Sequence, residues 1–252
     1  MTISKLMAAV LVAAILPAAC CAATPAEGRG THTTPDTFIE GGKPAPDIPW
    51  AVQLWDESPR VPATFACTAE QISATWVITA KHCVVDKAPS SLSIYATNQY
   101  PPEGIVQPLR LDRVVTNANA DVALLHLARR RALPQFPALV GSDHPYVGRR
   151  GLIYGFGKAN GDSEASPQSL RVAVVSLDGT SWIGDENGVA IVVTGITGSA
   201  RAGDSGGPLI DADAATLIGV LSSGSSSPGT NATAYYTSLY ACRDWIRGIA
   251  GV

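Results

Sequence analysis

Short apolar runs recur between residues 51 and 240, and Gly, Pro, Asn, Asp or Ser separate most of them. Apolar runs bounded by turn-forming residues are typical of β-strands. No helical period of apolar residues alternates with these runs, which argues against an α/β architecture. We therefore predict an all-β barrel or sandwich. Its predicted strands are 51–55, 74–79, 92–96, 105–115, 122–127, 151–154, 170–177, 189–194, 217–221 and 234–240.

Two stretches depart from the strand pattern. Residues 128–148 contain three arginines and three prolines, so we predict that they link two halves of the fold. Residues 240–249 are predicted to form a C-terminal helix. Cys242 falls in this helix, and we interpret it as a small buried hydrophobic residue.

Residues 1–23 have the pattern of a secretory signal peptide. Lys5 supplies the positive charge, an apolar stretch follows, and Cys21 begins a small-residue cleavage site. Pro17 interrupts the apolar stretch and no basic flank follows it, which argues against a membrane span. We predict a secreted, extracellular protein. A lipid anchor on Cys20 or Cys21 remains an open alternative.

Residues 24–38 contain Thr, Gly and Pro without apolar periodicity and are predicted to be a pro-segment. The remaining residues, 39–252, can bury a full core, because 46% of the chain is hydrophobic and only 15% is charged. The net charge of −3, with 18 Lys and Arg residues, provides no basic surface for nucleic acid. A polyanionic partner is not expected.

The sequence Gly-Asp-Ser-Gly-Gly-Pro-Leu, residues 203–209, is the first candidate for chemistry. The hydroxyl of Ser205 is a weak nucleophile that needs an adjacent base and donors for the oxyanion it creates. Glycines on both sides of Ser205 allow a tight turn that aims amide groups into a cleft. In α/β-hydrolases with G-x-S-x-G the histidine follows the serine. All four histidines precede Ser205 here, so the base must come from upstream.

His82 and Asp121 are the upstream candidates for the base and its carboxylate. His82 follows an apolar strand, and Asp121 opens another one. His126 competes as the base, but it lies five residues from Asp121 along a strand, and an odd offset places two side chains on opposite faces. The order is therefore His82, Asp121 and Ser205, with separations of 39 and 84 residues.

These three segments resemble those of the trypsin/chymotrypsin family of serine endopeptidases, with the short spacing of its compact bacterial members. The resemblance implies a serine protease domain over 39–252, with two six-stranded antiparallel β-barrels at about 39–130 and 148–240. The C-terminal helix follows the second barrel. The active cleft would lie between the barrels.

The resemblance also implies a chemistry. Ser205 would attack a peptide carbonyl and form an acyl-enzyme, with His82 as general base and Asp121 orienting the imidazole. The amides of Gly203 and Ser205 would form the oxyanion hole.

Two further features follow from the resemblance. Cys67 and Cys83, 16 residues apart, would form a disulfide next to the catalytic histidine. Such a loop closure stabilises an exported protein by roughly 3 kcal/mol. Cleavage before Ile39 would free an α-amino group that pairs with the carboxylate of Asp204, a zymogen activation. Phe38 precedes that bond, so trypsin-like activation is not implied.

By the same resemblance, Ser199 would form the floor of the primary specificity pocket. No acidic residue occurs in 195–203, so nothing there would compensate a Lys or Arg side chain of a substrate. We expect cleavage after uncharged residues. Arg201 leaves a preference for acidic residues as the second possibility.

The strand that binds the substrate backbone would contain Ser222, Ser223 and Gly224, and Ala234 would lie on the pocket side. Ser223 stands where an aromatic residue often occurs, which implies an open pocket wall. The cysteines of the usual pocket disulfide are missing, since neither 195–203 nor 222–236 contains one.

The alternative function is that of a catalytically inactive protease homologue acting as a binding or adhesion module, since geometry and not residue identity decides catalysis. The expected partners are protein or peptide substrates and protein inhibitors, with no nucleic acid and no membrane span. We expect a monomer without a cofactor or metal site, although scattered acidic residues leave calcium binding open.

Overall fold

The structure of the chain is a computed structural model that describes 39–58, 63–99, 106–141, 147–157, 169–225 and 229–252. The predicted signal peptide and pro-segment lie outside the described residues. None of the helices in the described ranges is long and apolar enough to cross a membrane.

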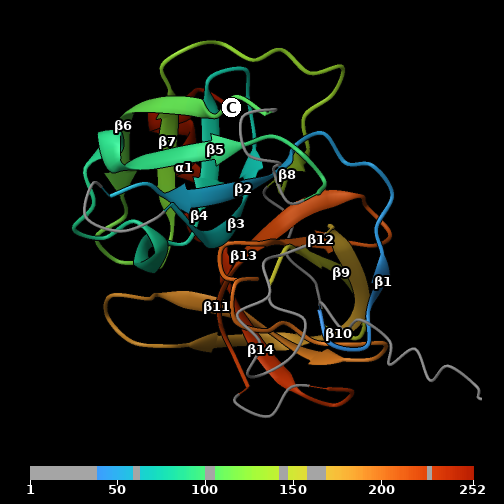
Figure 1. Cartoon of the computed structure of the whole chain (residues 1–252). Helices are drawn as coiled ribbons and strands as arrows, with labels where there is room; N and C mark the ends of the chain where they lie inside the picture. Colours follow the sequence, from blue (N-terminus) through green and yellow to red (C-terminus); the bar gives the residue numbers. More distant parts are fainter. Residues whose placement is uncertain (1–38, 59–62, 100–105, 142–146, 158–168, 226–228) are drawn as a thin grey trace, which may run out of the picture. The chain divides into compact units, whose positions relative to one another are not determined.

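Six antiparallel strands close the first barrel in the order β2-β3-β4-β7-β6-β5 (Figure 1). Apolar side chains of these strands, such as Val52, Ile78 and Leu124, are completely buried. The strands are β2 (Ala51–Asp56), β3 (Thr64–Gln71), β4 (Trp76–Thr79), β5 (Leu92–Tyr95), β6 (Leu109–Thr116) and β7 (Ala123–Leu127).

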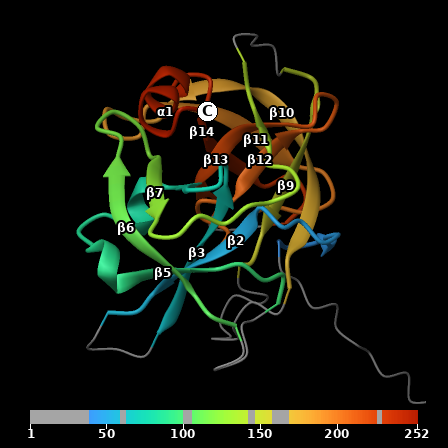
Figure 2. The ribbon, with the colours of Figure 1, turned by 90° about the horizontal axis from the view of Figure 1, so that it is seen from above.

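The second barrel closes in the order β9-β10-β11-β14-β13-β12, because β9 pairs with both β10 and β12 (Figure 2). A short strand extends this sheet on β10, and another pairs in parallel with β13. The six barrel strands are β9 (Arg150–Gly155), β10 (Arg171–Trp182), β11 (Val189–Gly195), β12 (Pro208–Asp211), β13 (Thr216–Gly224) and β14 (Thr233–Ser238). The two short strands are β1 (Lys43–Pro44) and β8 (Ala138–Leu139).

The fold prediction of two six-stranded antiparallel barrels and a C-terminal helix is confirmed. The helix α1 (Arg243–Ala250) begins later than predicted, and Cys242 immediately precedes it as a buried residue. The strands β3 and β12 were not predicted. β3 carries several polar residues, and β12 has four residues and begins with a proline.

Polar contacts join the two barrels. The amide of Thr68 on β3 donates to the carbonyl of Ser205 at 2.9 Å, and its hydroxyl donates to the carbonyl of Gly203 at 3.2 Å. The same hydroxyl accepts a hydrogen bond from the amide of Phe156 at 3.0 Å. Thr68 therefore fixes the segment around Ser205 against the first barrel.

Gly206 packs closely against two strands of the first barrel, β3 and β4. Its φ of +76° is in the left-handed region, and an added Cβ would lie 2.1 Å from the Thr79 hydroxyl and 2.4 Å from the Thr68 carbonyl oxygen. Only glycine fits this position, because both the dihedral angle and the space exclude a side chain.

We expect Gly206→Ala to lower the free energy of unfolding by more than about 2 kcal/mol, because it adds backbone strain to a steric clash. Gly248→Ala is the matched control. Gly248 lies within α1 with no atom within 4 Å of an added Cβ, so this change should stabilise the protein by up to about 1 kcal/mol. Denaturant unfolding in a Ser205→Ala background measures both. Equal effects of the two substitutions would contradict the account.

Candidate active site

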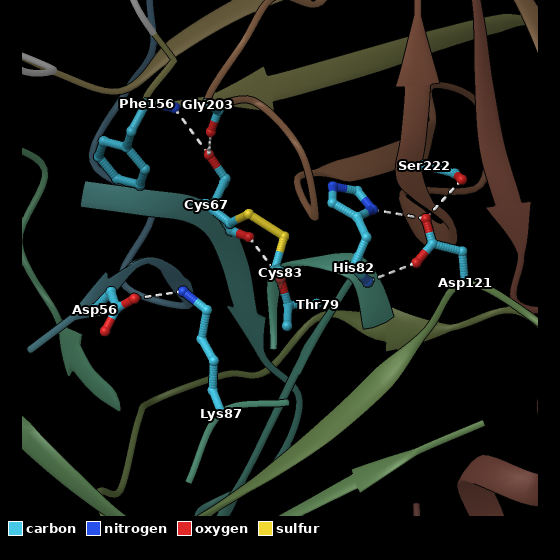
Figure 3. The surroundings of a disulfide bond; sticks show 11 residues. Asp56, Cys67, Thr79, His82, Cys83, Lys87, Asp121, Phe156, Gly203 and Ser222 are labelled. Atoms are coloured by element: carbon cyan, nitrogen blue, oxygen red, sulfur yellow. Dashed lines mark hydrogen bonds and ion pairs between the residues drawn. A yellow bond between two sulfur atoms is a disulfide. The ribbon is translucent and has the colours of Figure 1, made fainter. Parts of the chain in front are cut away.

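His82 and Asp121 meet at the ends of two paired strands of the first barrel. His82 lies in a short 3-10 turn (Lys81–Cys83) directly after β4, and Asp121 lies two residues before β7, which pairs with β4. His82 Nδ1 is 2.8 Å from Asp121 Oδ2, and the His82 amide donates to Asp121 Oδ1 at 2.9 Å (Figure 3). A proton on Nδ1 that is held by the carboxylate leaves Nε2 as the basic nitrogen.

The carboxylate of Asp121 has hydrogen-bond partners in both barrels. Its side chain is almost fully buried, and the hydroxyl of Ser222 on β13 donates to Oδ2 at 2.6 Å. Burial alone would raise the pKa of Asp121, but the hydrogen bonds from His82 and Ser222 outweigh it and hold the pKa below its ordinary value. Asp121 is therefore ionised at neutral pH and stabilises positive charge on the His82 imidazole.

Ser205 and His82 line the same hollow of about 340 Å³, together with both cysteines of the disulfide. Ser205 also lines a second hollow of about 220 Å³. No hydrogen bond joins the Ser205 hydroxyl and the His82 imidazole in the described part of the chain. Catalytic hydrogen bonds are often long without a substrate and shorten when it binds.

The backbone before Ser205 presents two amides. Gly203 has a φ of +92°, which favours glycine. Within the ranges that the structure describes, no hydrogen bond uses the amide N–H of Gly203 or of Ser205. The carbonyls of both residues, by contrast, are bound by Thr68. The amides are therefore available to an oxyanion, and Thr68 restrains the peptide groups on either side of them.

Asp204 is fully buried beneath this loop. Gly157 donates its amide to Oδ1 and Arg201 donates its amide to Oδ2, each at 2.8 Å. An added Cβ on Gly155 or Gly157 would lie 2.0 or 2.5 Å from Asp204 Oδ1, so glycines make the space for the carboxylate. Burial raises the pKa of Asp204 to about 7, against these two amide hydrogen bonds and the positive charge of Arg201.

The segment from Ile39 to Gly42 packs beside the region of Ser199. Ile39 is completely buried. Glu40 forms an antiparallel bridge with Ser199, whose amide donates to the Glu40 carbonyl at 2.9 Å. The segment that begins at the predicted cleavage site thus pairs directly with Ser199, a residue predicted to form the pocket.

The residues predicted to bind substrate occupy different places. Gly224 lines the smaller hollow, and Ser222 is bound to Asp121. Ser199 and Ala234 are buried and do not line that hollow, and the Ser199 hydroxyl accepts a hydrogen bond from the amide of Gly229. Ser223 also does not line it and pairs with β14 instead.

The predicted disulfide between Cys67 and Cys83 is present and joins β3 to the turn that carries His82. These two sulfurs and His82 form a group of three potential metal ligands in the described part of the chain. Because both sulfurs are in the disulfide, this group offers no thiolates to a metal.

The site also contains residues that the sequence analysis did not identify. Thr68 and Gly157 hold the loop around Ser205 through contacts that involve their backbone amides. Glu40 pairs with Arg201 at 3.1 Å. Glu40 lies in the segment that resembles the mature start of the family, but the sequence assigns no role to its side chain. Thr68 and Gly157 stand in no sequence pattern that signals a function, so only the fold identifies these contacts.

Comparison with known proteins decides the family, because the family model described as Trypsin matches residues 39–246. The chain belongs to the trypsin family. It is 28% identical over 239 residues to transmembrane protease serine 11E of Mus musculus, covering 85% of this chain and 55% of that protein. This chain thus spans about half the length of the mouse protein.

Two insect relatives match over nearly their whole length. Trypsin alpha of Drosophila erecta is 24% identical over 250 residues, which is 92% of this chain and 95% of the relative. Trypsin zeta of the same species is 27% identical over 254 residues, with 88% and 89% covered. Trypsin-family membership and these relatives identify the chain as a protein of the serine endopeptidase class.

The raised pKa of Asp204 predicts a pH dependence of stability for the uncleaved chain. Asp204 keeps its proton in the folded protein up to a pH of about 7, whereas in the unfolded chain it loses the proton near pH 4. The contribution of the protonated carboxyl to the free energy of unfolding is therefore complete below about pH 4. It is lost as the pH rises to about 7. In a Ser205→Ala background, Asp204→Asn should remove part of this decrease, of order 2 to 4 kcal/mol.

Urea unfolding at several pH values between 4 and 8 measures this effect. The comparison concerns the slope with pH, because Asp204→Asn also removes a hydrogen-bond acceptor and so adds a loss of stability that does not depend on pH. Identical slopes in the two proteins would show that Asp204 is already ionised before cleavage.

Proposed function

We propose that this protein is a secreted serine endopeptidase that hydrolyses peptide bonds through His82, Asp121 and Ser205. The observation that carries the proposal is the bonding of His82 Nδ1 to a buried, ionised Asp121, while Ser205 lines the same hollow as His82. The free amides of Gly203 and Ser205 support it, because they supply the electrostatic stabilisation that a serine nucleophile needs.

In the proposed mechanism, His82 Nε2 accepts the proton of Ser205 as Oγ attacks the substrate carbonyl. The amides of Gly203 and Ser205 bind the resulting oxyanion. His82 then donates the proton to the departing amine, and the acyl group remains on Ser205. Water, deprotonated by His82, releases the acyl group, and Ser205 regains its proton.

We further propose that 1–23 direct export, that 24–38 form a pro-segment, and that the mature protease domain comprises 39–252. Ile39 is buried, and within the described residues the Asp204 carboxylate accepts hydrogen bonds from two backbone amides and from no cationic side chain. Both observations support activation at this point. An α-amino group freed at Ile39 would supply the positive charge that Asp204 needs in order to ionise.

A matched set of single substitutions tests the triad. The secreted chain should begin at Ile39 and react with a fluorophosphonate, and Ser205→Ala should abolish the labelling. Asp121→Asn should lower kcat by about 10⁴, as it does in this family's established triad, because the imidazole then adopts the wrong tautomer. Ser90→Ala, at an exposed position in the 3-10 turn Pro89–Ser91 that lines neither hollow, is the control.

Correctly processed protein that is not labelled would contradict the enzyme function. That outcome would favour the alternative, a binding or adhesion module built on an inactive protease domain. No contact in the described part of the chain specifically favours this alternative.

The preference for the substrate residue before the cleaved bond forms a separate proposal. The small residues Ala200, Ala202 and Gly224 line the smaller hollow beside Ser205, and none of the described residues that line it is acidic. A lysine or arginine of the substrate would therefore lose its hydration without gaining a partner. We propose that uncharged residues are preferred.

A fluorogenic peptide library measures this preference. Cleavage after uncharged residues should exceed cleavage after Lys or Arg by at least about tenfold in kcat/KM, the discrimination expected when a charge is left uncompensated. A library profile dominated by Lys and Arg would refute the proposed preference without affecting the proposed triad.

A further inference from the structure

Among the described residues that line the smaller hollow beside Ser205, Arg201 is the charged one. A guanidinium at this place would attract an acidic side chain of the substrate, which is the second preference that the sequence leaves open. The carboxylate of Glu40 lies next to this positive charge. Arg201 Nη1 lies 3.1 Å from Glu40 Oε2, and the two side chains are 21% and 32% exposed.

The backbone of Glu40 is held in place. Its carbonyl accepts the amide of Ser199, and an added Cβ on Gly198 would lie only 2.2 Å from that carbonyl oxygen. This close packing fixes the backbone of Glu40 beside the segment that carries Arg201.

The carboxylate of Glu40 depends on Arg201 for its compensation. Glu40 Oε2 is buried, and from the residues that the structure describes it accepts no hydrogen bond and has Arg201 as its ion-pair partner. A buried carboxylate oxygen without compensation is costly. Glu40 and Arg201 therefore stabilise each other next to the hollow.

We propose that Glu40 determines the selectivity of this hollow by neutralising Arg201, and that it thereby excludes substrates with an acidic residue before the cleaved bond. The proposal rests on the proposed function and deepens it. Glu40 acts through Arg201 and does not touch the substrate, so it is a positioning residue. An acidic substrate side chain would have to compete with Glu40 for a partner that is already bound.

Two matched peptides test the proposal, one with Glu and one with Gln before the cleaved bond. The two side chains have nearly the same shape, so the Glu/Gln ratio of kcat/KM reports charge alone. The ratio should rise at least about tenfold in Glu40→Gln, because the guanidinium is then free to bind the substrate carboxylate. It should not rise in Arg201→Gln or in the double variant, where no guanidinium remains.

Asp244→Asn is the control for net charge. Asp244 is 98% exposed on α1, so this substitution changes the net charge by the same amount as Glu40→Gln but at the surface. Its Glu/Gln ratio should equal that of the unaltered protein. Glu40→Ala provides a second variant with the same expected increase if Glu40→Gln folds poorly.

A binding measurement separates this proposal from the proposed function. Calorimetric binding of the two intact peptides to Ser205→Ala proteins, with and without Glu40→Gln, should show the same change in ratio without catalysis. An unchanged ratio in protein that reacts with fluorophosphonate would overturn the role of Glu40. A changed binding ratio in protein that never reacts would support the role of Glu40 and refute the proposed enzyme function.

Discussion

The carboxylate of Asp121 is the group on which the arrangement of the site depends. It accepts two hydrogen bonds from His82 of the first barrel and one from Ser222 of the second. The Asp121 carbonyl also accepts a hydrogen bond from Thr237 on β14. A buried carboxylate is costly unless it is satisfied, and here the partners that satisfy it come from both barrels. The hydrogen bonds that satisfy this carboxylate therefore also fix the imidazole of His82 relative to β13.

Asp204 is a second carboxylate, and its different environment shifts its pKa in the opposite direction. Both carboxylates are buried, but Asp204 accepts hydrogen bonds only from two backbone amides in the described part of the chain. Its pKa is raised, whereas the pKa of Asp121 is lowered. In the proposed mechanism, Asp121 is held ionised and orients the base. Asp204 would ionise when a positive charge arrives, as the proposed activation by cleavage requires.

Most of the fold could be predicted because its strands carry apolar runs between turn residues. β3 is the informative exception. Thr68 and Glu70 lie on the same face of β3, and Thr68 contacts the second barrel from this face. Buried polar residues therefore occupy positions where an apolar run would be expected. Burial raises the pKa of Glu70 well above its ordinary value. A strand that is buried with polar side chains gives no periodic signal.

The candidate site likewise contains residues that could be predicted from the sequence and contacts that could not. His82, Asp121 and Ser205 could be predicted because their segments resemble a known family, and the disulfide followed from the same resemblance. The hydrogen bonds from the amides of Gly157 and Thr68 could not be predicted, because any residue type supplies a backbone amide. The contact between Glu40 and Arg201 depends on the register of Glu40 against Ser199, which the sequence does not specify.

The central claim is that a base and a carboxylate from the first barrel act on a hydroxyl from the second. A crystal structure of the mature protein after reaction with a peptidyl phosphonate tests it most directly. The account predicts phosphorus bonded to Ser205 Oγ and a phosphonyl oxygen about 2.7 to 3.1 Å from the amide nitrogens of Gly203 and Ser205. His82 Nε2 should face the same group. Phosphorus on another residue, or a phosphonyl oxygen directed into solvent, would contradict the account.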